Sequence, residues 1–246
     1  MNLNKSFLEH CQNHQFEINP NQVEIVNSLS NYYIENFKQN LLKKIFSKKF
    51  KKLGYYLVGD VGVGKTMILN FFFNGLQEKK MRLHFNEFMI KFHDSIFKNK
   101  DKKNGIENFV KDLSTKTEII YFDEFQVTNI VDAMILGKLF ETIFNEDIRI
   151  ILTSNTKIDD LYKEGLQRDQ FLPFIFLIKE NSIQNELFIE DDYRKSGLKK
   201  LDRAFFPINE KNIFNVNKIF REMTKYKKNT KVTLNVKGRD FIIDNF

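Results

Sequence analysis

The eight residues GDVGVGKT at positions 59–66 constrain this chain more than any other feature. They fit the pattern G-x-x-x-x-G-K-[ST], follow the short apolar run GYYLVG (54–59), and precede a segment (65–78) that suits a helix. The glycines allow positive φ angles, which turn backbone N–H groups inward, and the start of the helix adds the positive end of its dipole. The sequence therefore predicts a phosphate-binding loop between a buried strand and a helix.

The polar groups of this loop have predicted roles. Lys65 would reach the β and γ phosphates of a nucleotide, and the hydroxyl of Thr66 would coordinate Mg²⁺. A glycine-rich turn that binds no ligand is the alternative interpretation. The predicted nucleotide-binding residues are Gly59, Asp60, Val61, Gly62, Val63, Gly64, Lys65, Thr66 and Met67.

The segment IIYFDEF (119–125) supplies acidic groups that suit the same chemistry. Its apolar residues predict a strand that ends at Asp123, which can hold Mg²⁺ through water. Glu124 follows directly, where a carboxylate at the strand tip can orient and polarise an attacking water. On their own, these residues could also be two solvated acids at the end of a strand. Together with the phosphate loop, they predict Asp123 as a metal-binding residue and Glu124 as the catalytic carboxylate.

A third polar strand end narrows the class of nucleotide enzyme. The run IRIILTSN (148–155) predicts another buried strand, with Asn155 at its tip. GTPases carry D-x-x-G after the acidic strand and later N-K-x-D, and neither pattern occurs here. The pattern favours ATPases that add a strand between the two phosphate-site strands, where Asn155 would act as a polar sensor between the γ-phosphate and the water. A turn-forming asparagine is the alternative.

Strands and helices alternate through the middle of the chain, which predicts right-handed crossovers and a parallel sheet with helices on both faces. We therefore expect an α/β fold of the P-loop NTPase type, followed by a short α+β C-terminal appendage. The expected strands are 54–59, 82–88, 119–125, 148–155 and 182–190, and the expected helices are 21–47, 65–78, 88–98, 105–115, 131–146, 157–163 and 167–179.

The same pattern divides the chain into three predicted regions. The first is polar up to Pro20 and helical afterwards, and the last contains one helix and one hairpin. The regions are an N-terminal lead-in (1–52), an ATPase core (53–190) and a C-terminal part (191–246) with a helix at 210–227 and a hairpin at 233–243.

The amino-acid composition further limits the class of protein to which this chain can belong. The 246-residue chain has 39 basic and 32 acidic residues, and its net charge of +7 is mild for a nucleic-acid-binding protein. The single cysteine, Cys11, excludes an internal disulfide framework and a cysteine-based zinc site. The chain contains neither an apolar run long enough to span a membrane nor a signal-type start, so we expect a soluble protein of a reducing compartment.

Two further groups of residues are expected to have structural roles. The basic run at 43–52 is expected to be solvated surface, with contact to lipid, protein or nucleic acid as alternatives. His84 and His93 lie on segments with apolar patterns, and we expect them to be core or packing residues rather than acid–base groups.

Taken together, these motifs resemble those of a known family. Over roughly residues 15–245 the chain is similar to the ZapE / AFG-like ATPase family of AAA+ proteins. Family members normally continue beyond VKGR, so we expect that this chain, which ends at Phe246, lacks the family's C-terminal segment. The segments that carry the resemblance are GDVGVGKTM, RLHFNEFM, YFDEFQVTNIVDAMIL, TSN, DDLYKEGLQRDQFLPFI, DYR and VKGR.

The resemblance implies Mg²⁺-dependent ATP hydrolysis in a homo-oligomer that remodels proteins. It also implies that Arg168, in GLQRDQF, is an arginine finger that reaches the site of a neighbouring subunit. An ion pair with Asp169 or Glu164 is the alternative for this residue. Arg194 and Arg203 are candidates for a second sensing arginine.

The family's bacterial branch acts in cell division on the FtsZ ring, and its mitochondrial branch helps to remove misassembled inner-membrane proteins. By resemblance we expect FtsZ or another divisome protein as the partner, in the bacterial cytoplasm and at the division site, with the mitochondrial matrix as the alternative location. Peripheral membrane association is compatible with this interpretation, and a nucleic-acid partner is not expected. Two other functions stay open: a nucleic-acid-linked ATPase of the helicase-loader type, and a nucleotide-gated adaptor with little turnover.

Overall fold

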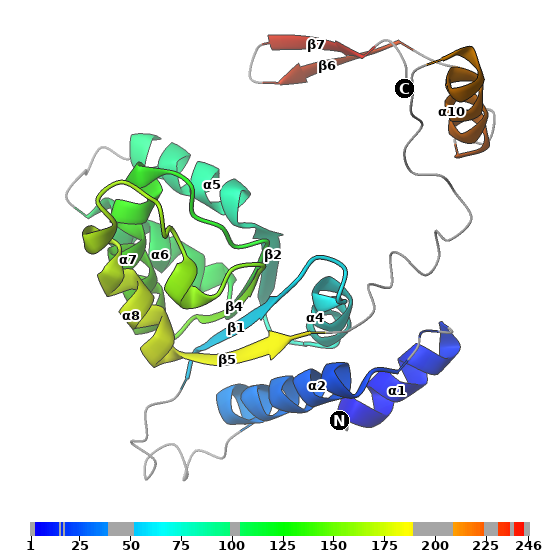
Figure 1. Ribbon diagram of the computed structural model, residues 1–246. Coiled ribbons are helices and arrows are strands. Elements are labelled where there is room, and N and C mark those ends of the chain that lie inside the picture. Colours follow the sequence, from blue (N-terminus) through cyan, green and yellow to red (C-terminus); the bar gives the residue numbers. More distant parts are fainter. Residues whose placement is uncertain are drawn as a thin grey trace. The chain divides into compact units, whose positions relative to one another are not determined.

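The computed structural model describes residues 3–14, 16, 18–38, 52–98, 104–188, 209–223, 231–236 and 239–243. The chain forms two compact units, Met1–Ser196 and Gly197–Phe246, which are drawn in Figure 1 and are described separately below. The first unit contains every residue of the predicted nucleotide site.

The first unit is built on a five-stranded sheet in which all neighbouring strands run parallel. The strand order is β2-β3-β4-β1-β5, so β4 lies between the two strands that carry the predicted phosphate and acid motifs. Both the parallel sheet and the inserted strand were expected, and both are confirmed. The strands are β1 (Gly54–Gly59), β2 (Lys80–His84), β3 (Ile119–Asp123), β4 (Arg149–Ser154) and β5 (Ser182–Leu187).

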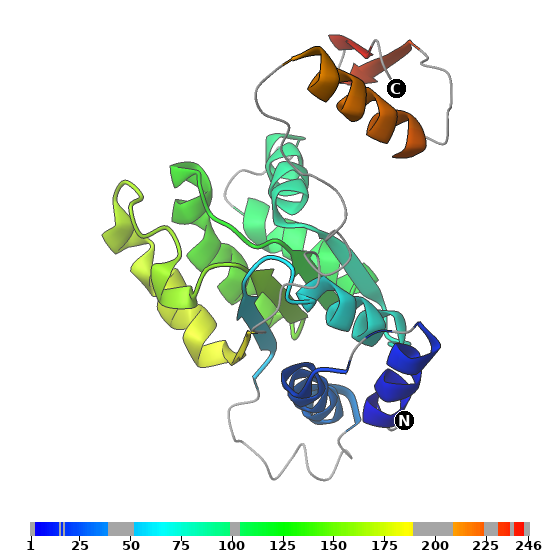
Figure 2. The same ribbon diagram turned by 45° about the vertical axis from the view of Figure 1, so that its right-hand side comes forward.

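Helices cover both faces of this sheet, as Figures 1 and 2 show from two directions. Alternate side chains of β3 enter opposite layers: Ile120 and Phe122 belong to one apolar cluster, and Ile119 and Tyr121 to the other. The first layer contains α5 (Phe85–Lys98), α6 (Gly105–Lys116), α7 (Ile130–Asn145) and α8 (Leu172–Asn181), and the second contains α1 (Leu3–Asn13), α2 (Pro20–Tyr33) and α4 (Lys65–Asn74).

The start of the chain is a helix, which corrects the prediction of a polar lead-in over residues 1–20. In α1, Leu3, Phe7 and Cys11 recur at four-residue spacing and are buried against α2 and α4. The polar residues between them hid this narrow apolar stripe in the sequence. The predicted helix over 21–47 corresponds to α2 and the π-helical turn η1 (Ile34–Lys38), and its remainder lies outside the described residues, as does most of the basic run at 43–52.

The second strand and the helix after it also differ from the prediction. The strand expected at 82–88 ends at His84, and α5 begins at Phe85. The reason is that Phe85, Phe88, Met89 and Phe92 recur with the helical period and are all buried, so the apolar residues assigned to the strand belong to a helix.

The helix after the phosphate loop, expected to reach residue 78, ends at Asn74. The ammonium of Lys80 donates hydrogen bonds to the carbonyl oxygens of Phe73 (2.7 Å), Asn74 (3.2 Å) and Leu76 (2.8 Å), which satisfies the open end of α4. The two short helices expected at 157–163 and 167–179 are the 3₁₀ turns η2 (Ile158–Asp160) and η3 (Arg168–Gln170), followed by α8. Among the residues that the structure describes, no helix combines the length and the apolar character needed to cross a bilayer.

The described residues of the second unit form one helix and one hairpin, as expected. These are α10 (Glu210–Met223) and the antiparallel pair β6 (Val232–Val236) and β7 (Arg239–Ile243), in which Thr233 is paired with Ile242. The rest of the predicted helix, up to residue 227, lies outside the described residues. Several of the unit's large apolar side chains are exposed, namely Ile213, Phe214, Val216, Phe220, Leu234, Phe241 and Ile242.

Candidate functional site

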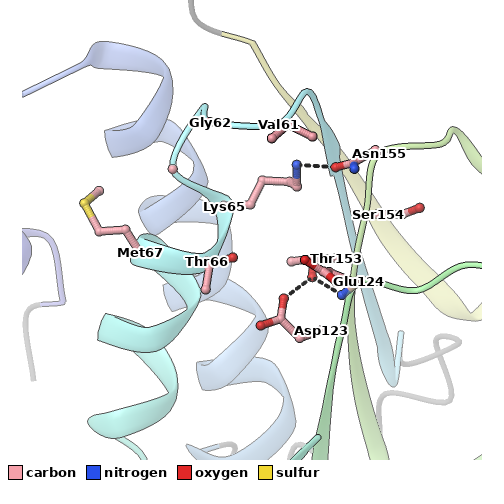
Figure 3. Close-up of a pocket in the computed structure, with 11 residues that line it drawn as sticks. Val61, Gly62, Lys65, Thr66, Met67, Asp123, Glu124, Thr153, Ser154 and Asn155 are labelled. Atoms are coloured by element: carbon pink, nitrogen blue, oxygen red, sulfur yellow. Dashed lines mark hydrogen bonds between the residues drawn. The ribbon is translucent and has the colours of Figure 1, made fainter. Parts of the chain in front are cut away.

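A cavity of about 260 Å³ opens at the edge of the sheet where β1, β3 and β4 end. Because the carboxyl ends of parallel strands meet at one edge, motifs that are far apart in the sequence come together there. Figure 3 shows the side chains around this cavity. Its lining residues are Val61, Gly62, Gly64, Lys65, Thr66, Met67, Asp123, Glu124, Thr153, Ser154 and Asn155.

The phosphate loop turns sharply between β1 and α4. Gly62 and Gly64 have φ angles of 96° and 94°, which residues with a Cβ rarely adopt. Space is also limited on the α2 side, because a Cβ on Gly64 would lie 2.7 Å from the side-chain nitrogen of Gln22. That nitrogen donates a hydrogen bond to the carbonyl oxygen of Val63 at 3.1 Å, so the buried Gln22 of α2 braces the loop from behind.

Lys65 connects the loop to the tip of β4. Its ammonium donates to the carbonyl oxygens of Gly59 (2.6 Å) and Asp60 (2.7 Å) and to the side-chain oxygen of Asn155 (2.8 Å). These three acceptors are neutral oxygens. The anionic oxygens of a phosphate would accept stronger hydrogen bonds from the ammonium, so they could replace them. Figure 3 shows Lys65 and Asn155 facing each other, with Thr66 one residue further along the helix.

Asp123 is held by three hydrogen-bond donors. Arg82 donates to Oδ2 at 2.6 Å, and the hydroxyl groups of Tyr121 and Thr153 each donate to Oδ1 at 3.0 Å. Burial alone would raise the pKa of Asp123, but the hydrogen bonds that it accepts, that from Arg82 first, outweigh burial and hold the pKa below its ordinary value. Burial also raises the pKa of Tyr121, so its phenol remains a donor. Asp123 is therefore a fixed anion.

Glu124, the next residue, has the opposite environment. Its side chain is 81% exposed, while that of Asp123 is 7% exposed. The backbone of Glu124 has a φ angle of 54°, an uncommon left-handed conformation for a residue with a side chain, and its N–H donates to the hydroxyl oxygen of Thr153 at 3.2 Å. This turn directs the two neighbouring carboxylates into different surroundings.

The structure thus brings most of the predicted site residues to one cavity. Lys65, Thr66, Asp123, Glu124 and Asn155 all line it. Of the other predicted nucleotide-binding residues, Val61, Gly62, Gly64 and Met67 line the cavity, Gly59 and Asp60 contact Lys65 through their carbonyl groups, and Val63 is buried with its carbonyl bonded to Gln22.

Arg168 does not line this cavity. It begins η3, after Gln167 in a left-handed conformation with φ of 56°, and its guanidinium donates to the carbonyl oxygen of Asp159 at 2.6 Å. Its hydrogen-bond partner within the described residues is thus a backbone carbonyl rather than the carboxylate of Asp169 or Glu164. The two candidates for a second sensing arginine, Arg194 and Arg203, lie outside the described residues.

The sequence analysis missed the residues that hold Asp123. Tyr121 lies two positions before Asp123 on the same strand face, and Thr153 lies two positions before Asn155, so strand alternation could have indicated both. The expectation of a core position is wrong for both His84 and His93, although the ring of His93 packs against that of Phe92. His84 is exposed, with Nδ1 3.9 Å from a carboxylate oxygen of Glu124, and the partly exposed ring of His93 is 2.7 Å from the carboxylate of Asp132.

A parallel sheet with an inserted strand, a phosphate loop and an acidic strand tip defines the AAA+ class of P-loop NTPases. The solved structure of DnaI supports this fold. The match covers 70% of this chain and 85% of the DnaI chain, with a TM-score of 0.50 and 17% sequence identity. The chain belongs to the AFG1-like ATPase family, whose family model matches residues 1–245.

Two relatives show how far this similarity extends. The chain is 36% identical over 210 residues to lactation elevated protein 1 homolog B of Danio rerio, covering 79% of this chain and 42% of that protein. It is 33% identical over 187 residues to the cell division protein ZapE of Escherichia coli K12, covering 76% of this chain and 50% of that protein. The chain therefore spans about half the length of the curated relatives that it matches.

Proposed function

We propose that this chain binds Mg²⁺·ATP in the cavity and hydrolyses it. One observation carries the proposal: three strand ends, far apart in the sequence, meet around the same space. The end of β1 supplies the cationic phosphate loop, the end of β3 supplies a fixed anion and an exposed carboxylate, and the end of β4 supplies Asn155. Loop amides and the ammonium of Lys65 would bind the phosphates, with Lys65 exchanging its bonds to the carbonyls of Gly59 and Asp60 for phosphate oxygens.

The residues around the cavity fit a magnesium ion. Hydroxyl and carboxylate oxygens are the ligands that this ion accepts, and Thr66 and Asp123 lie on facing sides of the cavity in Figure 3. The lowered pKa of Asp123 keeps its carboxylate ionised. A bound Mg²⁺ would neutralise part of the charge on the phosphate oxygens. Thr66 and Asp123 are the residues that would hold it.

Glu124 and Asn155 have the chemistry for the hydrolytic step. The exposed carboxylate of Glu124 can orient a water molecule and accept its proton as the water attacks the terminal phosphorus. The amide of Asn155 lines the cavity and contacts Lys65, so it could hold that water or a phosphate oxygen bound by Lys65. Attack of the water on the phosphorus displaces ADP as the leaving group.

Substitution of Lys65 tests this proposal. Titration calorimetry with Mg²⁺·ATP should show binding to the wild type and at least a hundredfold weaker binding to Lys65→Ala, because the charge-assisted contacts with the phosphates are lost. Lys157→Ala, which removes an exposed cation near the same edge, should bind like the wild type. A folded wild-type chain that ignores Mg²⁺·ATP contradicts the proposal, and binding without measurable hydrolysis indicates a nucleotide-gated adaptor instead.

We also propose that the hydrolysis acts on a protein partner in the bacterial cytoplasm, with the division ring as the first candidate. The support is the family resemblance and the name of the relative ZapE, a cell division protein. Co-sedimentation with FtsZ polymers should be stronger with Mg²⁺·ATP than with Mg²⁺·ADP, and should be lost in Lys65→Ala. No nucleotide-dependent sedimentation contradicts this partner, and stimulation of hydrolysis by single-stranded DNA at physiological salt indicates the helicase-loader type of function.

A further inference from the structure

Among the described residues that line the cavity, Arg82 contacts Asp123 through a side-chain hydrogen bond. It lies on the edge strand β2, where it is in register with Tyr121 of β3. Because side chains alternate along a strand, Arg82, Tyr121 and Asp123 lie on the same face of the sheet. Arg82 is not a lining residue of the cavity. Apart from the electrostatic effect of its charge, Arg82 therefore acts on the site through Asp123.

The guanidinium of Arg82 is fixed from two sides. It donates to Oδ2 of Asp123 at 2.6 Å, and its central carbon lies 5.1 Å from the ring centroid of Tyr121. The Arg82 side chain is 38% exposed, whereas the carboxylate that it contacts is buried. A planar cation stacked on an aromatic ring is restricted in orientation, so it can also restrict the group to which it donates.

The carboxylate of Asp123 has little hydrogen-bonding capacity left. Its two oxygens offer about four acceptor positions, and the donors Arg82, Tyr121 and Thr153 use three of them. In Figure 3 the carboxylate lies across the cavity from Thr66. The three donors thus determine which part of the carboxylate is available to a ligand in the cavity, and Arg82 is the only charged one among them.

We propose that Arg82 is a positioning residue for the nucleotide-bound metal ion: it holds Asp123 so that the remaining acceptor position faces Thr66. This inference rests on the proposed function. Two effects of Arg82 oppose each other, because its positive charge repels a cation while its hydrogen bond orients the ligand. The cation repulsion is screened by water at this partly exposed side chain, so we infer that orientation has the larger effect.

The test compares ADP affinity in EDTA with ADP affinity in excess Mg²⁺, measured with a fluorescent ADP analogue. The ratio of the two dissociation constants reports how strongly metal and nucleotide binding are coupled, without any need for hydrolysis. In Arg82→Met, which keeps an apolar stem over Tyr121, this ratio should fall about tenfold, while the affinity in EDTA stays within about twofold of the wild type. In Arg82→Lys, which keeps the charge but not the planar guanidinium, the ratio should fall about threefold.

Lys157→Met is the matched control, since it also removes one cation that is paired with a carboxylate, at 2.8 Å from Glu186, near the same edge of the sheet. Its ratio should equal that of the wild type. An unchanged or larger ratio in Arg82→Met overturns the inference while leaving the proposed function intact. If Arg82→Met does not fold, an unchanged ratio in Arg82→Lys overturns it instead. A wild type that binds no ADP under either condition overturns both proposals.

Discussion

Asp123 and Glu124 are adjacent in the sequence, yet they occupy two contrasting parts of the site. Asp123 belongs to a closed wall, which we define as Asp123 with Arg82, Tyr121 and Thr153, where each carboxylate oxygen already has a protein partner. Glu124 and Asn155 form an open rim, where both side chains are exposed. The backbone turn at Glu124 separates the two parts.

The contrast suggests that the wall and the rim have different tasks: the wall holds a metal ligand in a fixed position, and the rim carries the groups that react with water. A ligand oxygen for a metal ion benefits from being fixed before the ion arrives, because less ordering remains to be done on binding. A group that handles a water molecule and its proton must instead be reachable by solvent and able to move. The three predictions below test whether the wall and the rim are functionally distinct in this way.

The largest effect is expected at Arg168, which would complete the open rim of a neighbouring copy. Hydrolysis per molecule should rise with protein concentration in the wild type, and Arg168→Ala should lower the assembled rate by about 10³-fold. Mixing Arg168→Ala with Lys65→Ala should restore part of the activity. In mixed assemblies, the Arg168→Ala subunit provides an intact nucleotide site and its Lys65→Ala neighbour provides the arginine. Lys163→Ala, which removes a cation from the same surface, should behave like the wild type. A rate per molecule that is independent of concentration would contradict a shared site.

The next effect is expected at Glu124. Glu124→Gln should lower the hydrolysis rate by about 10²- to 10³-fold, because the amide cannot accept a proton from water. Its affinity for Mg²⁺·ATP should stay within about twofold of the wild type, because the wall and the phosphate loop are unchanged. Steady-state hydrolysis and calorimetry measure the two quantities, with Glu87→Gln as an exposed control. If Glu124→Gln hydrolyses ATP at the wild-type rate, the assignment of the rim is wrong.

The smallest effect is expected in the wall, at Thr153. This hydroxyl donates to Asp123 and accepts from the N–H of Glu124, so it joins the wall to the rim. Thr153→Val should lower hydrolysis about tenfold and the free energy of unfolding by about 1–3 kcal/mol, because Asp123 loses one of its three donors and the N–H of Glu124 loses its acceptor. Thr142→Val removes a buried hydroxyl that donates to the carbonyl oxygen of Lys138 within α7 rather than to a site residue, and should affect stability alone. Equal hydrolysis in both variants would show that Thr153 supports only the fold.

The rim, the phosphate loop and Asp123 were predictable from the sequence, and Arg82 in the wall was not. Long apolar runs identified β1, β3 and β4, and parallel strands bring their carboxyl ends to one edge, so Lys65, Asp123 and Asn155 could be expected together. Arg82 could not, because its contact with Asp123 depends on the register between two strands that the sequence leaves open.

Two of the errors in the fold arise where the local sequence conceals the pattern of buried residues. In α1 the apolar stripe is only one residue wide per turn, and its polar neighbours dominate the local composition. Around His84 and Phe85 the strand passes directly into a helix, so an apolar run crosses the boundary without a turn signal. Both segments become recognisable only when the surface against which they pack is known.

The brace between Gln22 and the phosphate loop has a practical consequence. Asn21, the residue before it, donates to the carbonyl oxygen of Phe188 just after β5, so the first turn of α2 contacts both the phosphate loop and the end of the neighbouring strand β5. A shortened protein that starts at residue 52 would keep every nucleotide-binding motif and still lack this turn. Measurements of nucleotide affinity on such a fragment would describe a loosened loop, and the first fifty residues should be retained whenever the ATP site is studied.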